Sequence, residues 1–317
     1  MKSLSIIIVN WNSGDLLVEC ISSIGLARQV NFALTEVVIV DNHSSDDSIA
    51  KVKAVTDLPF QLKIIANTEN KGFGAACNQG AANASCDFLL FLNPDTRLFK
   101  DSLSVPLAFM QRPENTDVGI VGIQLIDENN HVAKSCSRFP ALSFFLAQSL
   151  GINRLARLRH LTQSMAEWPH DNTQDVDQVM GAFFLIRRSP FNSLGGFDER
   201  FFVYFEEVDL SFRASQTGWR SVYLTETQAF HAGGGTSRQV KAKRLFYSLR
   251  SRILYVFKHF NPLTATLVLL ITLFIESISR SALAIARGSW TSLKETWAAY
   301  CMLLRWLPDW IIKGITR

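Results

Sequence analysis

The chain has 317 residues, of which 48% are hydrophobic and 19% charged, with only 17 Gly and 9 Pro. This composition excludes a disordered or fibrous protein, because the apolar side chains suffice to bury a large core. The formal net charge of +4 is unevenly distributed, with −6 on residues 1–226 and +10 on residues 227–317, so a basic tail suited to anionic partners follows a mildly acidic body.

The first hundred residues alternate short apolar runs with segments of helical spacing. The predicted strands are Leu4–Val9, Val37–Val40, Leu62–Ala66 and Phe88–Leu92, and the predicted helices are Asp15–Gly25, Ser44 or Ser45 to about Val55, and Gly74–Ala84. This alternation is typical of βαβ units around a parallel sheet. Because ligands bind beyond the carboxyl ends of such strands, the first candidate site residues are Asn10, Asp41, Asn67, Asn93 and Asp95.

A second cluster of interest follows the apolar run Ala182–Ile186, where a helix is predicted over Phe205–Ser215. Its first turn holds three carboxylates, Glu206, Glu207 and Asp209, in an aromatic setting. Burial and like charges raise the pKa of a carboxylate and make it a stronger base, whereas the positive end of the helix dipole acts the other way. An acidic first helical turn without catalytic function is the structural alternative.

From Lys241 the chain changes character. Lys241–His259 is predicted as a basic amphipathic helix, and Arg244, Arg250 and Arg252 in it are candidates for phosphate contacts. The apolar run Leu263–Ile275 has 13 residues before Glu276 interrupts it, fewer than the roughly 20 that span a bilayer. Four of the seven Trp lie beyond it. We expect residues 241–317 to lie in a membrane interface. The alternatives are a true membrane span and packing on the body or on a second subunit, which would give a homodimer.

Single motifs in the body leave several interpretations open. Asp41 could accept a hydrogen bond from a pyrimidine or a ribose, or cap a helix. The segment Lys71–Cys77 contains Gly-x-Gly between a strand and a helix, but Cys77 occupies the third glycine position, which disfavours dinucleotide binding. Asp95 in Asn-Pro-Asp could hold a divalent cation or belong to a turn. His231 before a Gly run could be a metal ligand or a structural histidine.

Taken in order, these fragments resemble inverting glycosyltransferase family 2 and its bacterial rhamnosyltransferase-like branch. The matching segments are SIIIVNWN, VVIVDNHSSDDS, NKGFGAACNQG, FLNPDT, GAFFLIRR, GGFDERFFVYFEEVDLSFRA and HAGGGTS. The resemblance spans residues 4 to about 237. It implies an α/β fold of the GT-A nucleotide-diphospho-sugar transferase type, with a mostly parallel sheet flanked by helices and a C-terminal helical, membrane-associating extension. Residues 1–240 would form the catalytic domain, with a nucleotide-binding half to about 125 and an acceptor half beyond it.

The resemblance also assigns the nucleotide site. Asp41 matches the residue that recognises the base, and Trp11 matches the aromatic residue beside the nucleotide. The other residues in segments that line the nucleotide pocket are Asn10, Lys71, Gly72, Asn78, Asn93 and Asp95.

The resemblance also assigns the metal-binding residues and the general base. Asp95 and His231 match the two metal-binding positions, for Mg²⁺ or Mn²⁺, and Asn93 replaces the first Asp of the family's Asp-x-Asp motif. Glu207 matches the general base, where the family usually has Asp, and Glu206 is the alternative base.

The expected function is transfer of a hexose such as L-rhamnose from a dTDP- or UDP-sugar to a lipid-linked or polysaccharide acceptor with inversion. A polyprenyl-diphosphate-linked glycan and an anionic membrane surface are the expected partners, and nucleic acid is not. The five cysteines lack a Cys-x-x-Cys pair and fit a cytoplasmic protein, here on the inner face of the cell membrane. The alternative is a catalytically inactive binding module that keeps the same fold.

Overall fold

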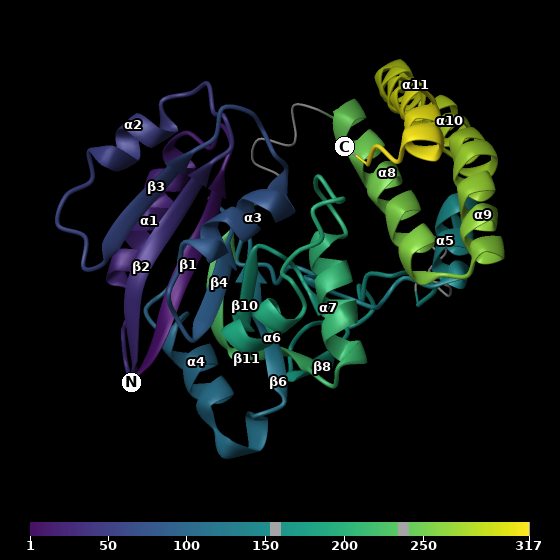
Figure 1. Cartoon of the computed structure of the whole chain (residues 1–317). Helices are drawn as coiled ribbons and strands as arrows, with labels where there is room; N and C mark the ends of the chain where they lie inside the picture. The colour runs from purple at the N-terminus through teal and green to yellow at the C-terminus, as the bar shows by residue number, and fades with distance from the viewer. Residues whose placement is uncertain (153–159, 234–240, 317) are drawn as a thin grey trace.

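The computed structural model describes residues 1–152, 160–233 and 241–316 (Figure 1). Within them, one mixed sheet of nine strands has the order β3-β2-β1-β4-β10-β6-β11-β5, with β8 also paired to β11. The strands are β1 Lys2–Asn10, β2 Phe32–Asp41, β3 Gln61–Ala66, β4 Phe88–Leu92, β5 Thr96–Leu98, β6 Val118–Ile126, β8 Gln174–Val176, β10 Phe183–Arg187 and β11 Arg220–His231, and a small second sheet pairs β7 Cys136–Ser137 with β9 Gln178–Val179.

Helices cover both faces of the sheet and form a separate group at one side (Figure 1). They are α1 Asp15–Leu26, α2 Ser48–Lys53, α3 Phe73–Ala82, α4 Ser104–Gln111, α5 Leu142–Leu150, α6 Arg188–Ser193, α7 Glu206–Gln216, α8 Lys241–His259, α9 Pro262–Leu270, α10 Ser277–Ala286 and α11 Trp290–Lys313, with a 3₁₀ turn at Pro113–Asn115 and a π-helix at Ile271–Glu276.

Alternation along β1 explains the layers. Leu4, Ile6 and Ile8 belong to the core that includes α1 and α4, whereas Ile7 and Val9 face the core that includes α3 and α7. Strands buried on both faces read as continuous apolar runs, and this confirms the predicted α/β fold with a parallel centre. β1 to β4 are parallel, β6 is parallel to β11, and β10 runs antiparallel between β4 and β6.

One predicted helix start is wrong. The helix expected from Ser44 or Ser45 begins at Ser48 instead. The Ser44 hydroxyl donates to Asp41 Oδ1 at 2.5 Å, and the Ser45 N–H donates to Asn12 Oδ1 at 2.7 Å. Both serines therefore serve the loop after β2 and do not cap the helix.

The tail also differs from expectation. The helix does not stop at Glu276, because the π-helix joins α9 to α10 in one helical run, Pro262–Ala286. Glu276 is tolerated there since its carboxylate pairs with Arg252 and Arg280. By length and composition this run could cross a membrane, although a third of its most apolar window is buried in the protein. Because Arg252 is buried in this ion pair, its predicted phosphate contact is wrong.

Candidate functional site

The carboxyl ends of β1 and β2 bring Asn10 and Asp41 together. The two residues are paired in the parallel ladder, and Asn10 Nδ2 donates to Asp41 Oδ1 at 2.8 Å. The same amide lies within 3.0 Å of the hydroxyl oxygens of Ser44 and Ser48. Asn10 is fully buried and Asp41 nearly so. This network holds the Asp41 carboxylate in one orientation at the carboxyl end of β2.

Asn42, which was not among the predicted site residues, joins the end of β2 to the turn at Lys71 and Gly72. Its Nδ2 donates to the Gly72 carbonyl at 3.0 Å, and its Oδ1 accepts from the Lys71 N–H at 3.2 Å. The Asn67 amide donates to the same oxygen at 3.1 Å. The signal in the sequence was its place directly after Asp41, at a strand end.

Trp11 lies on the surface directly after β1, with 37% of its area exposed. The next residue, Asn12, has φ of 53° and accepts from the Ser45 N–H. The turn that carries Trp11 is thus tied to the loop after Asp41.

Gly72 brings the start of α3 against the segment that precedes Glu206 and Glu207. Its φ is +86°, and a Cβ on it would lie 2.4 Å from the Phe202 carbonyl oxygen. The neighbouring Phe73 N–H donates to that same oxygen at 2.7 Å. Only glycine allows this approach, because it lacks the Cβ that would collide and adopts positive φ without strain.

Asp95 and His231 meet although they are 136 positions apart in the sequence. β5 pairs with the end of β11, where His231 lies opposite Thr96. This pairing places His231 Nε2 3.3 Å from Asp95 Oδ1. Both side chains are about one-tenth exposed. Asn93 forms the turn between β4 and β5, since its carbonyl accepts from the Thr96 N–H at 3.1 Å.

Asp95 and His231 bring together two side chains of the kinds that ligate metals. A carboxylate oxygen and an imidazole nitrogen 3.3 Å apart suit a divalent cation whose other ligands come from substrate or water. Among the described residues, no three His, Cys, Asp or Glu side chains converge to hold a metal ion. A cation here would therefore need ligands beyond the described His, Cys, Asp and Glu side chains.

Glu206 and Glu207 open helix α7 after two residues with left-handed backbone, Tyr204 (φ 68°) and Phe205 (φ 71°). Non-glycine residues rarely adopt this conformation, and it persists only where the surroundings hold it. One carboxylate oxygen of each Glu, Oε2, is buried without a hydrogen-bond partner in the described structure.

Burial dominates the electrostatics of this pair. It raises the pKa of Glu206 well above its usual range, and the charge of Glu207 raises it further. Burial likewise raises the pKa of Glu207. Two like charges close together resist ionising at once, so the pair retains protons to a higher pH than an isolated carboxylate would.

Asn78 lies on α3, and its side chain contacts the protein backbone. Its Nδ2 donates to the Phe197 carbonyl at 2.8 Å, and its Oδ1 accepts from the Phe197 N–H at 2.9 Å. The amide thus fixes the segment that leads to Glu206.

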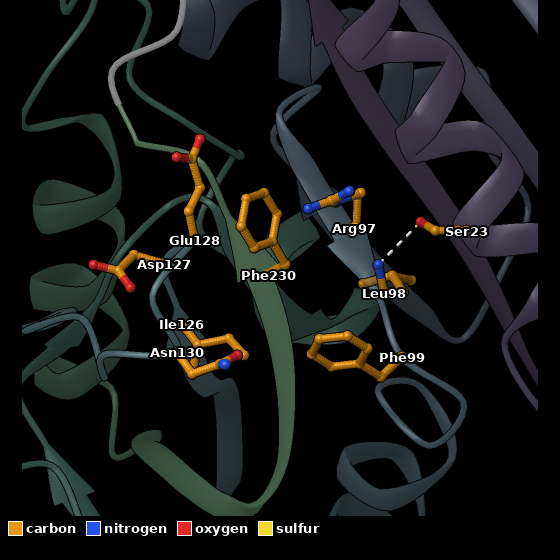
Figure 2. A pocket seen from close by; sticks show the side chains of 9 residues that line it. All are labelled: Ser23, Arg97, Leu98, Phe99, Ile126, Asp127, Glu128, Asn130 and Phe230. Atoms are coloured by element: carbon orange, nitrogen blue, oxygen red, sulfur yellow. Dashed lines mark hydrogen bonds between the residues drawn. The ribbon is translucent and has the colours of Figure 1, made fainter.

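A pocket of about 470 Å³ lies beside the end of β11, and Figure 2 shows its lining. The guanidinium of Arg97 lies over the ring of Phe230 at 4.0 Å. These two residues are opposite each other in the β5–β11 ladder, directly next to His231 and Thr96. The lining includes none of the predicted site residues, so the pocket adjoins the candidate site without containing it.

Two solved structures share this architecture. The mannosyltransferase PcManGT from Pyrobaculum calidifontis, in complex with GDP-Man and Mn²⁺, has a TM-score of 0.56 and 17% identity over 95% of this chain and 86% of that one. The TarS 1-349 fragment of S. aureus has a TM-score of 0.53 and 16% identity over 95% and 81%. These likenesses show the fold alone, which is that of a GT-A type nucleotide-sugar transferase.

The sequence match is more specific. The profile described as glycosyl transferase family 2 matches residues 5–195, and this chain belongs to that family. It is 27% identical over 239 residues to the N-acetylglucosaminyl-diphospho-decaprenol L-rhamnosyltransferase of Mycobacterium tuberculosis, over 72% of this chain and 75% of that protein. It is 32% identical over 176 residues to the rhamnosyltransferase WbbL of Escherichia coli, over 55% and 62%. The predicted rhamnosyltransferase-like resemblance is thus confirmed.

Proposed function

We propose that this glycosyltransferase moves a hexose, L-rhamnose or a similar sugar, from a dTDP- or UDP-sugar to a hydroxyl of a polyprenyl-diphosphate-linked glycan, with inversion, for cell-surface polysaccharide synthesis. The names of the M. tuberculosis and E. coli relatives support the sugar and the lipid-linked acceptor. The observation that carries the proposal is the pair of carboxyl groups with raised pKa, buried Glu206, which lies against Gly74, and half-buried Glu207.

The nucleotide would bind at the carboxyl ends of β1 and β2. Asp41, oriented by Asn10, accepts a hydrogen bond from the pyrimidine, and the exposed ring of Trp11 covers the base. Lys71 and Gly72 follow β3 and approach the diphosphate, where a glycine permits close backbone contact. Asn78 acts indirectly in this proposal, because both ends of its amide hold Phe197.

Asp95 and His231 would hold Mg²⁺ or Mn²⁺, with Asn93 supplying a neutral hydrogen-bonding group beside them. When bound, such a cation stabilises negative charge on a departing diphosphate. The PcManGT structure was solved with Mn²⁺, which supports a metal of this kind here.

The chemical step is a single displacement. Glu207 takes the proton of the acceptor hydroxyl as the hydroxyl oxygen forms a bond to the anomeric carbon. The bond from that carbon to the diphosphate oxygen breaks, and the diphosphate leaves with the electron pair. Attack from the face opposite the leaving group inverts the anomeric centre. A base with a raised pKa is suited to this proton transfer near neutral pH.

The tail would bring the enzyme to a lipid-linked acceptor at the inner face of the membrane. Exposed apolar residues recur at three- and four-residue intervals along the helical run Pro262–Ala286 and at seven-residue intervals along α11, so each helix presents an apolar stripe. The exposed residues of the two stripes are Leu263, Leu267, Leu270, Phe274, Ile278, Ile285, Trp290, Trp297, Leu304 and Ile311. The tail's net positive charge suits an anionic lipid surface.

A nucleotide-sugar screen tests the function. We expect UDP or dTDP, with Mn²⁺, to raise the melting temperature of the full chain, and one of their sugars to be transferred to a lipid-linked glycan. Replacing His231 with Ala should remove the contribution of Mn²⁺. Nucleotide binding without transfer or donor hydrolysis would instead favour the inactive binding module.

Vesicle flotation tests the membrane role. The full chain should float with vesicles that contain anionic lipid, and Trp290→Ser combined with Ile311→Ser should reduce flotation. Leu26→Ser, which changes an exposed apolar residue at the far end of α1, is the matched control. Flotation unchanged by the tail substitutions contradicts the role.

A further inference from the structure

The segment Gly195–Phe205, here called the base loop, determines where helix α7 and its two Glu residues begin. Two of its contacts come from the nucleotide half. The Phe73 N–H donates to the Phe202 carbonyl at 2.7 Å, and the Asn78 amide holds Phe197 through two hydrogen bonds. The base loop is thus fixed to α3 at two points, Phe73 at the start of the helix and Asn78 in its second turn.

Two more polar contacts come from tail helix α8. The Ser251 hydroxyl donates to the Val203 carbonyl at 2.8 Å, one residue before the left-handed pair that precedes Glu206. The Lys258 ammonium donates to Asp198 Oδ2 at 2.7 Å and also to Asp209 Oδ1. Lys258 therefore joins the base loop to the first turns of α7 with one charged group.

These contacts are largely removed from water. The side chain of Lys258 is 17% exposed, that of Asp198 13%, and that of Asp209 is fully buried. Ion pairs in such surroundings are little screened, and removing one partner leaves an uncompensated buried charge.

Apolar packing joins the same two segments. Phe201 and Val208, on either side of the left-handed pair, lie in the cluster formed by α8, α9 and α11 and not in the two cores of the sheet. The ring of Tyr255 on α8 lies 5.4 Å from that of Phe205, and Tyr247 stacks on Phe202 at 4.8 Å. The tail therefore packs against one side of the base loop (Figure 1).

We propose that Ser251 and Lys258 are positioning residues for the transfer reaction, which makes α8 a part of the catalytic machinery as well as of the tail. The left-handed backbone at Tyr204 and Phe205 is strained, and the contacts with α8 hold it. Without them the base loop relaxes and the Glu207 carboxylate moves. A displacement of about 1 Å can cost roughly 100-fold in rate. The catalytic part of this inference rests on the proposed function.

The test uses full-length Lys258→Met, Lys258→Arg and Ser251→Ala. Lys313→Met is the matched control, because Lys313 lies in the same tail but is exposed and pairs with Asp309. Lys258→Met should lower kcat at least ~10-fold with little change in the KM for the donor or in the melting shift caused by UDP or dTDP. Lys258→Arg should restore most of the rate, and Ser251→Ala should lie between it and Lys258→Met.

Hydrogen exchange provides a readout that does not depend on activity. Amides of residues 197–208 should lose protection in Lys258→Met and Ser251→Ala and keep it in Lys313→Met. Unchanged kcat, or unchanged protection, overturns the inference, as does a loss of rate that parallels loss of nucleotide binding. If the wild type transfers no sugar, the proposed function has failed, and the exchange comparison alone decides whether α8 holds the base loop.

Discussion

The start of helix α7 presents the same chemical group in two opposite environments. Glu206 and Glu207 lie on the side of α3, where Glu206 packs against Gly74 and both carboxyl groups act on the buried thiol of Cys77. Asp209, two residues after Glu207, lies on the side of α8 and accepts hydrogen bonds from Lys258 and His259.

The pKa values of these groups move in opposite directions. Burial raises the pKa of both Glu side chains. Burial also acts to raise the pKa of Asp209, but the hydrogen bond from His259 and the charge of Arg213, with Lys258, lower it overall. Burial alone therefore does not decide protonation: carboxylates paired with cations hold the structure, whereas those left without cations can exchange a proton.

The largest expected effect is at Glu207. Glu207→Gln keeps the shape of the side chain but cannot accept a proton, so turnover should fall by ~10²–10⁴-fold while UDP or dTDP still raises the melting temperature. Glu114→Gln, in the 3₁₀ turn, is the control. If Glu206→Gln abolishes transfer and Glu207→Gln does not, the base is Glu206.

On the paired side, Asp209→Asn should destabilise the fold. It removes the carboxylate that pairs with Arg213 and Lys258 and accepts from His259, while Lys258 keeps its pair with Asp198, at a cost of about 3 kcal/mol. Because the folded pKa of Asp209 lies below its ordinary 3.8, its contribution is present above that value and is lost as pH falls through the folded pKa. Urea unfolding at pH 7 and at pH values below 3.8 measures this difference.

The exposed pair of Asp309 with Lys313 supplies the control for that measurement. Asp309→Asn should change the free energy of unfolding by less than about 1 kcal/mol. An equal loss in Asp309→Asn and Asp209→Asn would contradict the distinction between the two sides of α7.

The contact that joins the two regions is tested by Gly72→Ala. The added Cβ would meet the Phe202 carbonyl and adopt an unfavourable positive φ, so the free energy of unfolding should fall by roughly 1–3 kcal/mol and transfer should weaken. Gly25→Ala, whose Cβ would have its nearest contact at 3.5 Å from Pro59, should leave both unchanged. Calorimetry with and without UDP or dTDP distinguishes the two variants.

The smallest expected effect is an increase in stability, not a loss. Glu206→Gln removes a buried carboxyl whose folded pKa is raised above its ordinary 4.5. Such a group stabilises the fold below its unfolded pKa, and this contribution is lost as pH rises through the folded pKa. Glu206→Gln should therefore raise the melting temperature at pH 7 by about 2–4 °C, with an advantage over wild type that grows from pH 5 to 8. Destabilisation at pH 7 would show that an undescribed cation compensates Glu206.

Much of the secondary structure of residues 1–125 was predictable because its determinants are local. The run Phe88–Leu92 forms β4 as expected, and the predicted Asp15–Gly25 helix ends one residue later. Boundaries failed where a residue had a distant partner, as at Ser45, whose N–H donates to Asn12, 33 positions away. Neither β5 nor β11 was predicted, although their pairing brings His231 to Asp95.

By itself, the sequence determined the fold class, the polar residues at the strand ends and the three carboxylates at the start of α7, because periodicity and residue type are local properties. Only the tertiary structure decided which of those carboxylates are paired and which are not. That depends on Lys258 and His259, about 50 positions further along the chain, and on the strained backbone at Tyr204 and Phe205. Contacts between distant segments set the local charge environment, and no window of sequence contains them.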